Sequence, residues 1–198
     1  MEVLPVDFAK RLSSSSSRSQ QELAIKIKKT HNLTIVLQNG SKRLLKEYIT
    51  CQGPPFGTPS FSASITPFPG LPLPSLSAKA RLDLSDAERL QEDALAFSNL
   101  PAFLTTVLRQ QTLLNPTATD LHQQLDTSQM QCLGLANNLK SIMASMGIMP
   151  GPAVPAEPPE EGSTFAMKTV GYQICQLYQV WASQSQEDLA LLVAKYPV

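Results

Sequence analysis

The placement of proline constrains this chain more than any other feature of its sequence. Twelve of the 16 prolines fall in two windows, residues 54–74 and 150–159. Because proline lacks a backbone N–H and interrupts helices, we interpret both windows as linkers. What lies between and around them predicts four long helices, at about residues 20–50, 85–114, 117–146 and 164–195.

Each predicted helix carries an apolar stripe at helical spacing. The stripe in residues 117–146 is the most regular, because Ser128 is its only polar member. The stripe in residues 85–114 includes Asp93 and Gln111, and Ser85 with Glu88 predicts a capping box at its start. Four helices that each bury one stripe pack together as a bundle, so we predict an all-α fold.

The lengths of the connections predict the topology of this bundle. A helix of about 30 residues is about 45 Å long, and an extended chain crosses that distance in about 14 residues. The linkers at residues 51–84 and 147–163 both reach that length, whereas only Asn115-Pro116 joins the second and third helices. Two long crossovers and one short corner predict an up-up-down-down arrangement, the pattern of helical cytokines. The second linker also fits antiparallel neighbours.

We expect one folded domain, residues 20–198, preceded by a disordered serine-rich tail at residues 1–19. The first 12 residues contain no apolar run of the kind that a signal peptide needs. Taken alone, this N-terminus favours the cytosol.

Composition and motifs argue against several classes of function. Lys+Arg 16 and Asp+Glu 16 give a net charge of zero, which disfavours nucleic-acid binding, and no apolar stretch is long enough for membrane insertion. The cysteines Cys51, Cys132 and Cys175 lack metal-ligand spacing, and the two histidines, His31 and His122, belong to no catalytic motif. We therefore predict no metal, no cofactor and no catalytic residue.

Charge is nevertheless uneven along the chain. The first predicted helix is basic, and both a solvated face and a partner-steering surface fit its cations, Lys26, Lys28, Lys29, Lys42, Arg43 and Lys46. The same helix contains two N-glycosylation sequons, which make Asn32 and Asn39 candidate sites if the chain enters the secretory route.

Several short motifs resemble one known family. They are GPPFGTPSFS at residues 53–62, KTHNL at 29–33, LNP at 114–116 and DLALLVAKY at 188–196. These motifs are similar to the first crossover, first helix, central corner and last helix of cardiotrophin-like proteins. The chain thus resembles the interleukin-6 family of four-helix cytokines, in the branch that includes ciliary neurotrophic factor and leukaemia inhibitory factor.

The residues FAMK at 165–168 look like the FxxK signature of this branch. The resemblance implies that Phe165 and Lys168, which share a helix face at i and i+3, bind the leukaemia inhibitory factor receptor. A lysine in the first turn opposes the helix dipole, so folding alone gives little reason for it. The alternative for Phe165 is a hydrophobic staple on its own helix.

The family also binds glycoprotein 130 through outward faces of its first and third helices. No short motif marks that surface here, and a plain solvated surface fits the same pattern. The candidates are the residues whose helix positions place them on those outward faces: Lys28, Lys29, Asn32, Gln123, Gln124, Asp126 and Gln131.

The resemblance implies a secreted cytokine that dimerises glycoprotein 130 with the leukaemia inhibitory factor receptor. Kinase and STAT signalling would then promote cell survival, proliferation or differentiation. We expect a monomer that leaves the cell by a non-classical route, with an alpha co-receptor left open as a third partner. The alternative is an intracellular helical adaptor or lipid-binding bundle, which the leaderless N-terminus and the unpaired cysteines favour.

Overall fold

The computed structural model of the chain describes residues 6–64, 66–75, 77–159 and 162–198. Within these ranges the regular structure is helical, apart from one isolated bridge between Phe68 and Leu71. This confirms the predicted all-α class. The helices are α1 (Val6–Gln52), α2 (Ala78–Leu82), α3 (Asp86–Leu114), α4 (Thr119–Ser145) and α5 (Thr164–Lys195).

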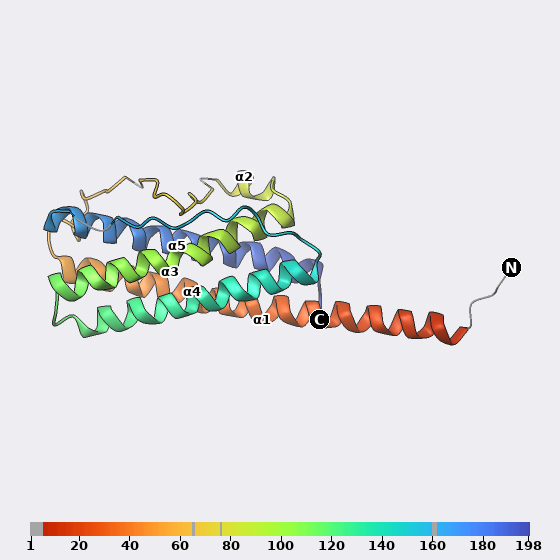
Figure 1. Cartoon of the computed structure of the whole chain (residues 1–198). Helices are drawn as coiled ribbons and strands as arrows, with labels where there is room; N and C mark the ends of the chain where they lie inside the picture. Colours follow the sequence, from red (N-terminus) through yellow and green to blue (C-terminus); the bar gives the residue numbers. More distant parts are fainter. Residues whose placement is uncertain (1–5, 65, 76, 160–161) are drawn as a thin grey trace.

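The four long helices form a bundle in which α1 and α3 run in one direction and α4 and α5 in the other (Figure 1). Helix α1 packs against α4 and α5, and α3 packs against the same two helices. Long crossovers outside the bundle join α1 to α3 and α4 to α5, whereas a short corner joins α3 to α4. The predicted up-up-down-down topology is therefore confirmed.

Side-chain caps set the starts of α3 and α5. The Ser85 hydroxyl accepts a hydrogen bond from the Glu88 N–H at 3.2 Å, and the Glu88 carboxylate accepts one from the Ser85 N–H at 2.7 Å. This is the predicted capping box. At α5, the Ser163 hydroxyl accepts from the Ala166 N–H at 3.2 Å. These caps satisfy backbone donors that have no partner within the helix.

Helix α1 begins earlier than the sequence predicts. Residues 6–19 of the predicted disordered tail are helical and project past the other helices (Figure 1). The serine run at residues 13–17 contains neither proline nor glycine, and each residue added to a formed helix gains one backbone hydrogen bond. Helix α1 thus extends into residues 6–19, where the sequence suggests a tail, while residues 1–5 lie outside the described residues.

The core contains polar side chains at stripe positions as well as apolar ones. Asp93, Gln111 and Ser128 are all buried, as their places on the stripes imply. The Gln111 amide oxygen accepts from Gln52 Nε2 at 2.8 Å, and its Nε2 donates to the Tyr48 hydroxyl at 3.2 Å. Burial of such groups costs free energy unless they are hydrogen-bonded, and these pairs offset that cost.

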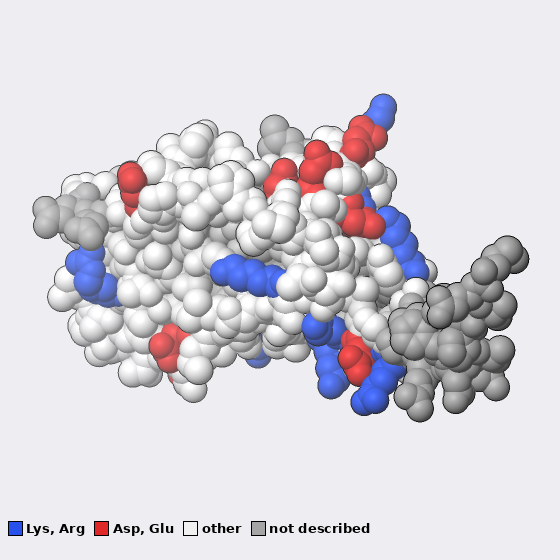
Figure 2. Space-filling view, turned by 45° about the vertical axis from the view of Figure 1, so that its right-hand side comes forward, with Lys and Arg blue, Asp and Glu red and all other residues white. Residues whose placement is uncertain are grey.

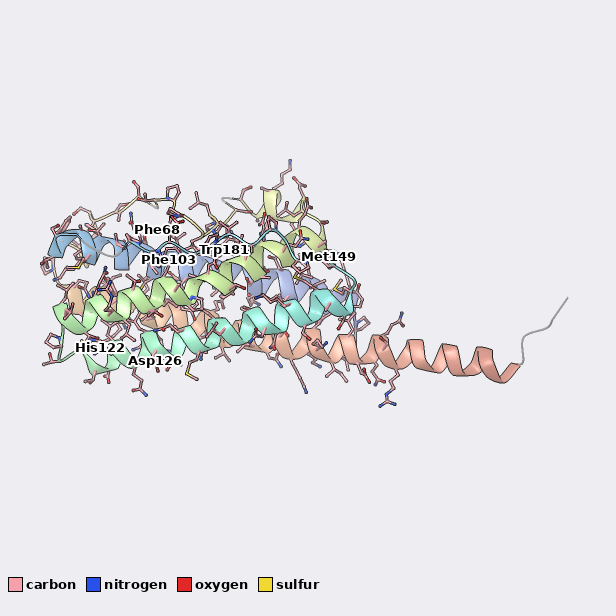
Figure 3. All side chains as sticks on the ribbon, viewed as in Figure 1. Phe68, Phe103, His122, Asp126, Met149 and Trp181 are labelled. Carbon is pink, nitrogen blue, oxygen red and sulfur yellow. The ribbon has the colours of Figure 1, made fainter. Side chains whose placement is uncertain are left out.

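Helix α5 holds the first crossover through side chains that donate to crossover carbonyls. Trp181 Nε1 donates to the carbonyl of Pro72 at 2.9 Å. Gln184 Nε2 donates to the carbonyl of Ser75 at 2.7 Å. Phe68 of the same crossover packs on Phe103 of α3, with ring centroids 5.7 Å apart (Figure 3). The crossover is therefore part of the packed structure.

The two crossovers also contact each other. Asn99 of α3 donates from Nδ2 to the carbonyl of Gly70 at 2.6 Å and to that of Val154 at 2.7 Å, which joins both crossovers to one side chain. Gly70 has a φ of 81°, and a Cβ at this position would overlap the backbone of Pro155. Only glycine fits this close approach without strain.

The short helix α2, which the sequence analysis missed, places a buried cation between α3 and α5. Arg81 is 4% exposed, and its guanidinium donates to Asp93 of α3 at 2.8 Å and to Asp188 of α5 at 2.8 and 2.5 Å. It also pairs with Glu92 and lies 5.5 Å from the centroid of the Trp181 ring. We call Arg81, Asp93 and Asp188 the buried ion cluster.

Burial changes the acidity of this cluster. It raises the pKa of Asp93 well above its ordinary value, with a further contribution from the neighbouring Asp188 charge. Burial also raises the pKa of Asp188, although Arg81 acts in the opposite direction. Because two adjacent carboxylates in a desolvated site resist joint ionisation, the pair retains a proton more readily than exposed aspartates do.

Candidate functional site

Phe165 lies in the first turn of α5, where its side chain is 56% exposed. Its ring contacts Phe56 of the first crossover, with centroids 5.8 Å apart and planes at 39°. The staple alternative predicted packing on its own helix, whereas this contact is made by another element. A large apolar ring is thus held in place while much of it stays open to solvent.

Three further rings support Phe165. Phe56 is 4% exposed and lies 4.8 Å from Phe61 and 6.0 Å from Tyr172, measured between ring centroids. Phe61 and Tyr172 meet at 5.4 Å. We call Phe56, Phe61, Phe165 and Tyr172 the aromatic cluster. Tilted and edge-on ring pairs of this kind add to simple area burial, so the cluster fixes the exposed ring before any partner arrives.

Lys168 lies one turn after Phe165 and is half-buried. Its Nζ donates to the carbonyl of Gln52, the last residue of α1, at 3.3 Å. A cation at a helix C-terminus interacts favourably with the helix dipole, so this lysine does have a role in folding. The sequence suggested that a lysine at this position has little role in folding, and the hydrogen bond to Gln52 corrects that expectation.

The backbone beneath Lys168 is fixed by α1 as well. The Tyr48 hydroxyl donates to the carbonyl of Lys168 at 2.8 Å. Gly171, one turn further along α5, makes room for the same ring, because a Cβ there would overlap the Tyr48 hydroxyl. Burial raises the pKa of Tyr48, so its phenol stays protonated and remains a donor at physiological pH.

Phe165 and Lys168 therefore meet the same short segment, where α1 ends and the first crossover begins. The carbonyl of Gln52 accepts the hydrogen bond from Lys168, and the ring of Phe56, four residues later, contacts the ring of Phe165. The sequence predicted the exposed pair but not these two partners, which become neighbours only when α1 and α5 lie side by side. An exposed ring beside an ammonium group suits a partner pocket that combines apolar walls with a carboxylate.

The second predicted surface lies where α1 and α4 are adjacent. A groove of about 300 Å³ between these helices is lined by Gly40 and Arg43 from α1 and by Gln123, Gln124 and Gln131 from α4, among others. A Cβ on Gly40 would lie 3.6 Å from the Gln131 amide oxygen. We call this the α1–α4 groove, and the sequence analysis missed its α1 side.

The other predicted residues of this surface do not line the groove. Lys28, Lys29 and Asn32 are exposed on α1, eight to twelve residues before Gly40, which corresponds to roughly 12–18 Å along the helix. Asp126 lies on the outer side of α4 (Figure 3) and is exposed. The structure thus brings three of the seven candidates together and leaves four on the surrounding surface.

The two sequons on α1 combine an exposed asparagine with a buried hydroxyl. Asn32 and Asn39 are exposed. Thr34 and Ser41 are fully buried and donate to backbone carbonyls at 2.6 and 2.9 Å. Because the whole sequon must be accessible to be modified, glycosylation of either site would have to precede folding of α1.

Within the described part of the chain, no group of three His, Cys, Asp or Glu side chains is placed to hold a metal ion. No helix in that part combines the length and apolar character that a membrane crossing requires.

Comparison with known proteins identifies similar chains. A sequence model described as ciliary neurotrophic factor matches residues 27–197. Cardiotrophin-1 of Mus musculus is 37% identical over 179 residues, which cover 86% of this chain and 87% of that protein. Cardiotrophin-2 of Mus musculus is 34% identical over 175 residues, covering 86% and 84%. Ciliary neurotrophic factor of Mus musculus is 27% identical over 153 residues, covering 75% and 74%.

Proposed function

The chain belongs to the ciliary neurotrophic factor family of interleukin-6-type cytokines, and we propose that it signals by bridging two receptor chains. Members of this family are signalling proteins rather than enzymes, and their partners are cytokine receptors. In this proposal Phe165 and Lys168 contact the leukaemia inhibitory factor receptor. We assign glycoprotein 130 to the α1–α4 groove and the exposed residues around it.

The exposed ring of Phe165 carries this proposal. Energetically dominant interface residues are typically aromatic or cationic groups that a partner fully desolvates. Phe165 is exposed although Phe56, directly beneath it, is buried, and Lys168 places an ammonium group beside it. An immobilised ring loses little conformational entropy on binding, which favours its use as an anchor.

Two separate contact surfaces suit a cytokine that brings receptor chains together. Gly40, in the α1–α4 groove, precedes Gln52 by 12 residues, or about 18 Å of helix. Two receptor chains therefore have separate surfaces to bind. In this proposal the protein acts outside cells as a monomer, and the paired receptors start kinase and STAT signalling that promotes survival, proliferation or differentiation. An alpha co-receptor remains open as a third partner.

The decisive experiment replaces the exposed pair and a matched pair elsewhere. Phe165→Ala with Lys168→Ala should weaken binding to the leukaemia inhibitory factor receptor by about 30-fold or more, since one dominant interface residue contributes about 2 kcal/mol or more. The control is Leu82→Ala with Lys79→Ala, another exposed apolar and cationic pair at i and i+3, on α2. Surface plasmon resonance would measure both receptors.

The control should bind like the wild type, and circular dichroism should show full helicity for both double variants. Undiminished receptor binding by folded Phe165→Ala/Lys168→Ala protein would refute the site. A wild-type protein that binds neither receptor would refute the function and favour the intracellular bundle.

The second surface needs its own test. Gln124→Arg places a bulky charge in the α1–α4 groove and should weaken glycoprotein 130 binding while leaving the other receptor unaffected. Asn137→Arg adds the same side chain at an exposed position of α4 outside the lining of the groove and serves as the control. Equal effects of the two variants would move the glycoprotein 130 contact away from the groove.

A further inference from the structure

A larger groove lies where α3 begins, α4 ends and the second crossover passes between them. It has a volume of about 480 Å³, within the range of about 300–1,000 Å³ that is typical of ligand sites. We call it the α3–α4 groove. The residues that matter for its chemistry are Glu88, Glu92, Leu95, Lys140, Met143 and Val154.

Hydrogen bonds from α3 hold the crossover wall of this groove in place. Gln91 Nε2 donates to the carbonyl of Met149 at 2.7 Å, and Asn99 Nδ2 donates to the carbonyl of Val154 at 2.7 Å. The Met149 side chain is 76% exposed and lies on the crossover just after the end of α4 (Figure 3), next in sequence to the lining residue Pro150. A wall that is already positioned costs little entropy when a partner binds.

The floor of the groove is apolar, whereas its α3 rim is acidic. Buried Met143 and half-buried Leu95 form the floor, and the exposed prolines of the crossover belong to the wall. Glu88 and Glu92 are one turn apart, so both face the same side of α3. Figure 2 shows acidic side chains gathered at the end of the bundle where α2 and the start of α3 lie.

The two carboxylates differ in how far they are already paired. Glu92 pairs with Arg81. Glu88 accepts two hydrogen bonds from Ser85, and both end on Oε2. These hydrogen bonds lower the pKa of Glu88, so its charge persists at physiological pH. Glu88 is therefore exposed, charged and without an ion pair among the described residues.

We propose that the α3–α4 groove docks a partner protein through an apolar side chain flanked by a basic one. The apolar chain would fill the floor beside Leu95 and Met143, and the basic group would meet Glu88 on the α3 rim. Lys140 on the α4 side disfavours a second cation there, which fixes the orientation of the pair. Exposed Met149, next to the lining residue Pro150, offers apolar surface outside the groove, which suits a protein partner.

This surface lies far from Phe165 and shares no lining residue with the α1–α4 groove. Asp86, at the start of α3, forms an ion pair with Lys195 at the end of α5, with 2.7 Å between Lys195 Nζ and Asp86 Oδ2. Phe165 begins the same 32-residue helix, so it lies about 45 Å away. The α3–α4 groove therefore offers a third partner surface, whose loss would leave the Phe165 contact intact.

Selection of displayed peptides on the full chain tests the proposal. Random peptides are selected on wild-type protein and counter-selected on Ala153→Trp, which fills the groove from an exposed crossover position. We expect peptides that place an aromatic or large aliphatic residue beside Arg or Lys. Their affinity should fall at least tenfold in Ala153→Trp.

A second pair of variants isolates the charge. Glu88→Gln removes the carboxylate but keeps the capping box, because glutamine also serves at that position. It should weaken the peptides about three- to fivefold, as expected for loss of one exposed ion pair. Glu187→Gln makes the same chemical change at an exposed position of α5 outside the groove and should have no effect.

Three outcomes would overturn the proposal. Selected peptides without basic residues would show that charge plays no part, and peptides that retain affinity for Ala153→Trp would place their binding elsewhere. A wild-type dimer in sedimentation that Ala153→Trp dissociates would assign the groove to a second copy of the chain. Circular dichroism and unchanged binding at Phe165 confirm that every variant is folded.

Discussion

The two ends of the bundle place their aromatic and charged groups in opposite ways. Where α1 ends and α5 begins, the aromatic cluster keeps Phe165 56% exposed, and Lys168 is only half-buried. Where α2 meets α3 and α5, the buried ion cluster hides Arg81 behind Asp93 and Asp188. One end presents an anchored ring to solvent, and the other holds a guanidinium in the core between carboxylates.

This difference indicates which groups serve binding and which serve stability. A buried cation with three carboxylate partners has no capacity left for another protein, so its removal should affect folding. An exposed ring held by buried rings contributes little to the core, so its removal should affect partners. The following variants test that division.

Arg81→Ala should have the largest effect on stability. It removes the guanidinium that donates to buried Asp93 and Asp188, and only Arg89, whose Nε lies 3.6 Å from Asp188 Oδ1, remains beside the pair. Loss of a buried partner of this kind typically costs about 3–5 kcal/mol. Urea unfolding followed by circular dichroism measures the loss. Arg18→Ala breaks an exposed pair with Glu22 and should leave the midpoint unchanged. A loss below about 1 kcal/mol for Arg81→Ala would contradict the structural role of the cluster.

Gly171→Ala should be the next most damaging change. Its new Cβ would overlap the Tyr48 hydroxyl, and overpacking of this kind costs about 1–3 kcal/mol. Tyr48→Phe in the same background removes the atom nearest to the new Cβ, while the ring carbon Cζ at 2.8 Å remains, so it should restore only part of the stability. Gly134→Ala in α4 is the control, because its Cβ meets nothing within 4 Å and alanine favours a helix. The thermal unfolding midpoints of the wild type and the three variants measure these effects.

Phe56→Leu should have a moderate effect that appears in binding as well as in stability. The ring contacts with Phe165 are lost, and ring pairs contribute about 0.5–1.5 kcal/mol, so receptor affinity should fall by up to about tenfold. Phe68→Leu breaks a similar pair with Phe103 away from the site. It should lower the unfolding midpoint to a similar extent without changing receptor affinity. Equal affinity losses would show that the aromatic cluster has no special link to Phe165.

Asp93→Asn should have the smallest effect, which depends on pH. Burial raises the pKa of Asp93. At pH values between the ordinary and the raised pKa, the folded chain therefore keeps a proton on Asp93 that the unfolded chain releases. The stability from this group is complete below the ordinary aspartate pKa and declines as pH rises through the raised value. Asparagine keeps an acceptor for Arg81 and does not titrate. The variant should therefore show a shallower fall in urea midpoint between pH 4 and pH 8, and an unchanged slope would contradict the assignment.

Local rules explain why the helices were predictable. The capping box at Ser85 and the clustered prolines define where α3 begins and where the crossovers run. Asp93 and Gln111 interrupt an apolar stripe, and each proved to be buried with polar partners. A polar residue on an otherwise apolar stripe thus signals a buried partner, although the sequence does not identify that partner.

The partners themselves depend on contacts between distant segments. Arg81 and Asp188 are 107 residues apart, and Arg81 lies in a five-residue helix that is too short for a periodic signal. Likewise, the FAMK motif indicated Phe165 and Lys168, but Phe56 and Gln52 join them only through the packing of α1 on α5. Local pattern predicts which residues are exposed, whereas topology decides what supports them.

Three side chains of α5 bond backbone carbonyls of the first crossover at one constant offset in sequence. Hydrogen bonds join Gln173 to Ser64, Trp181 to Pro72 and Gln184 to Ser75, and each pair is separated by 109 positions. Between Ser64 and Ser75 the crossover therefore advances along the α5 axis by about the same distance per residue as the helix does. A deletion or insertion of one residue between Ser64 and Ser75 would misalign the later pairs. Although surface loops usually vary freely in length, this one is under the same length constraint as a helix.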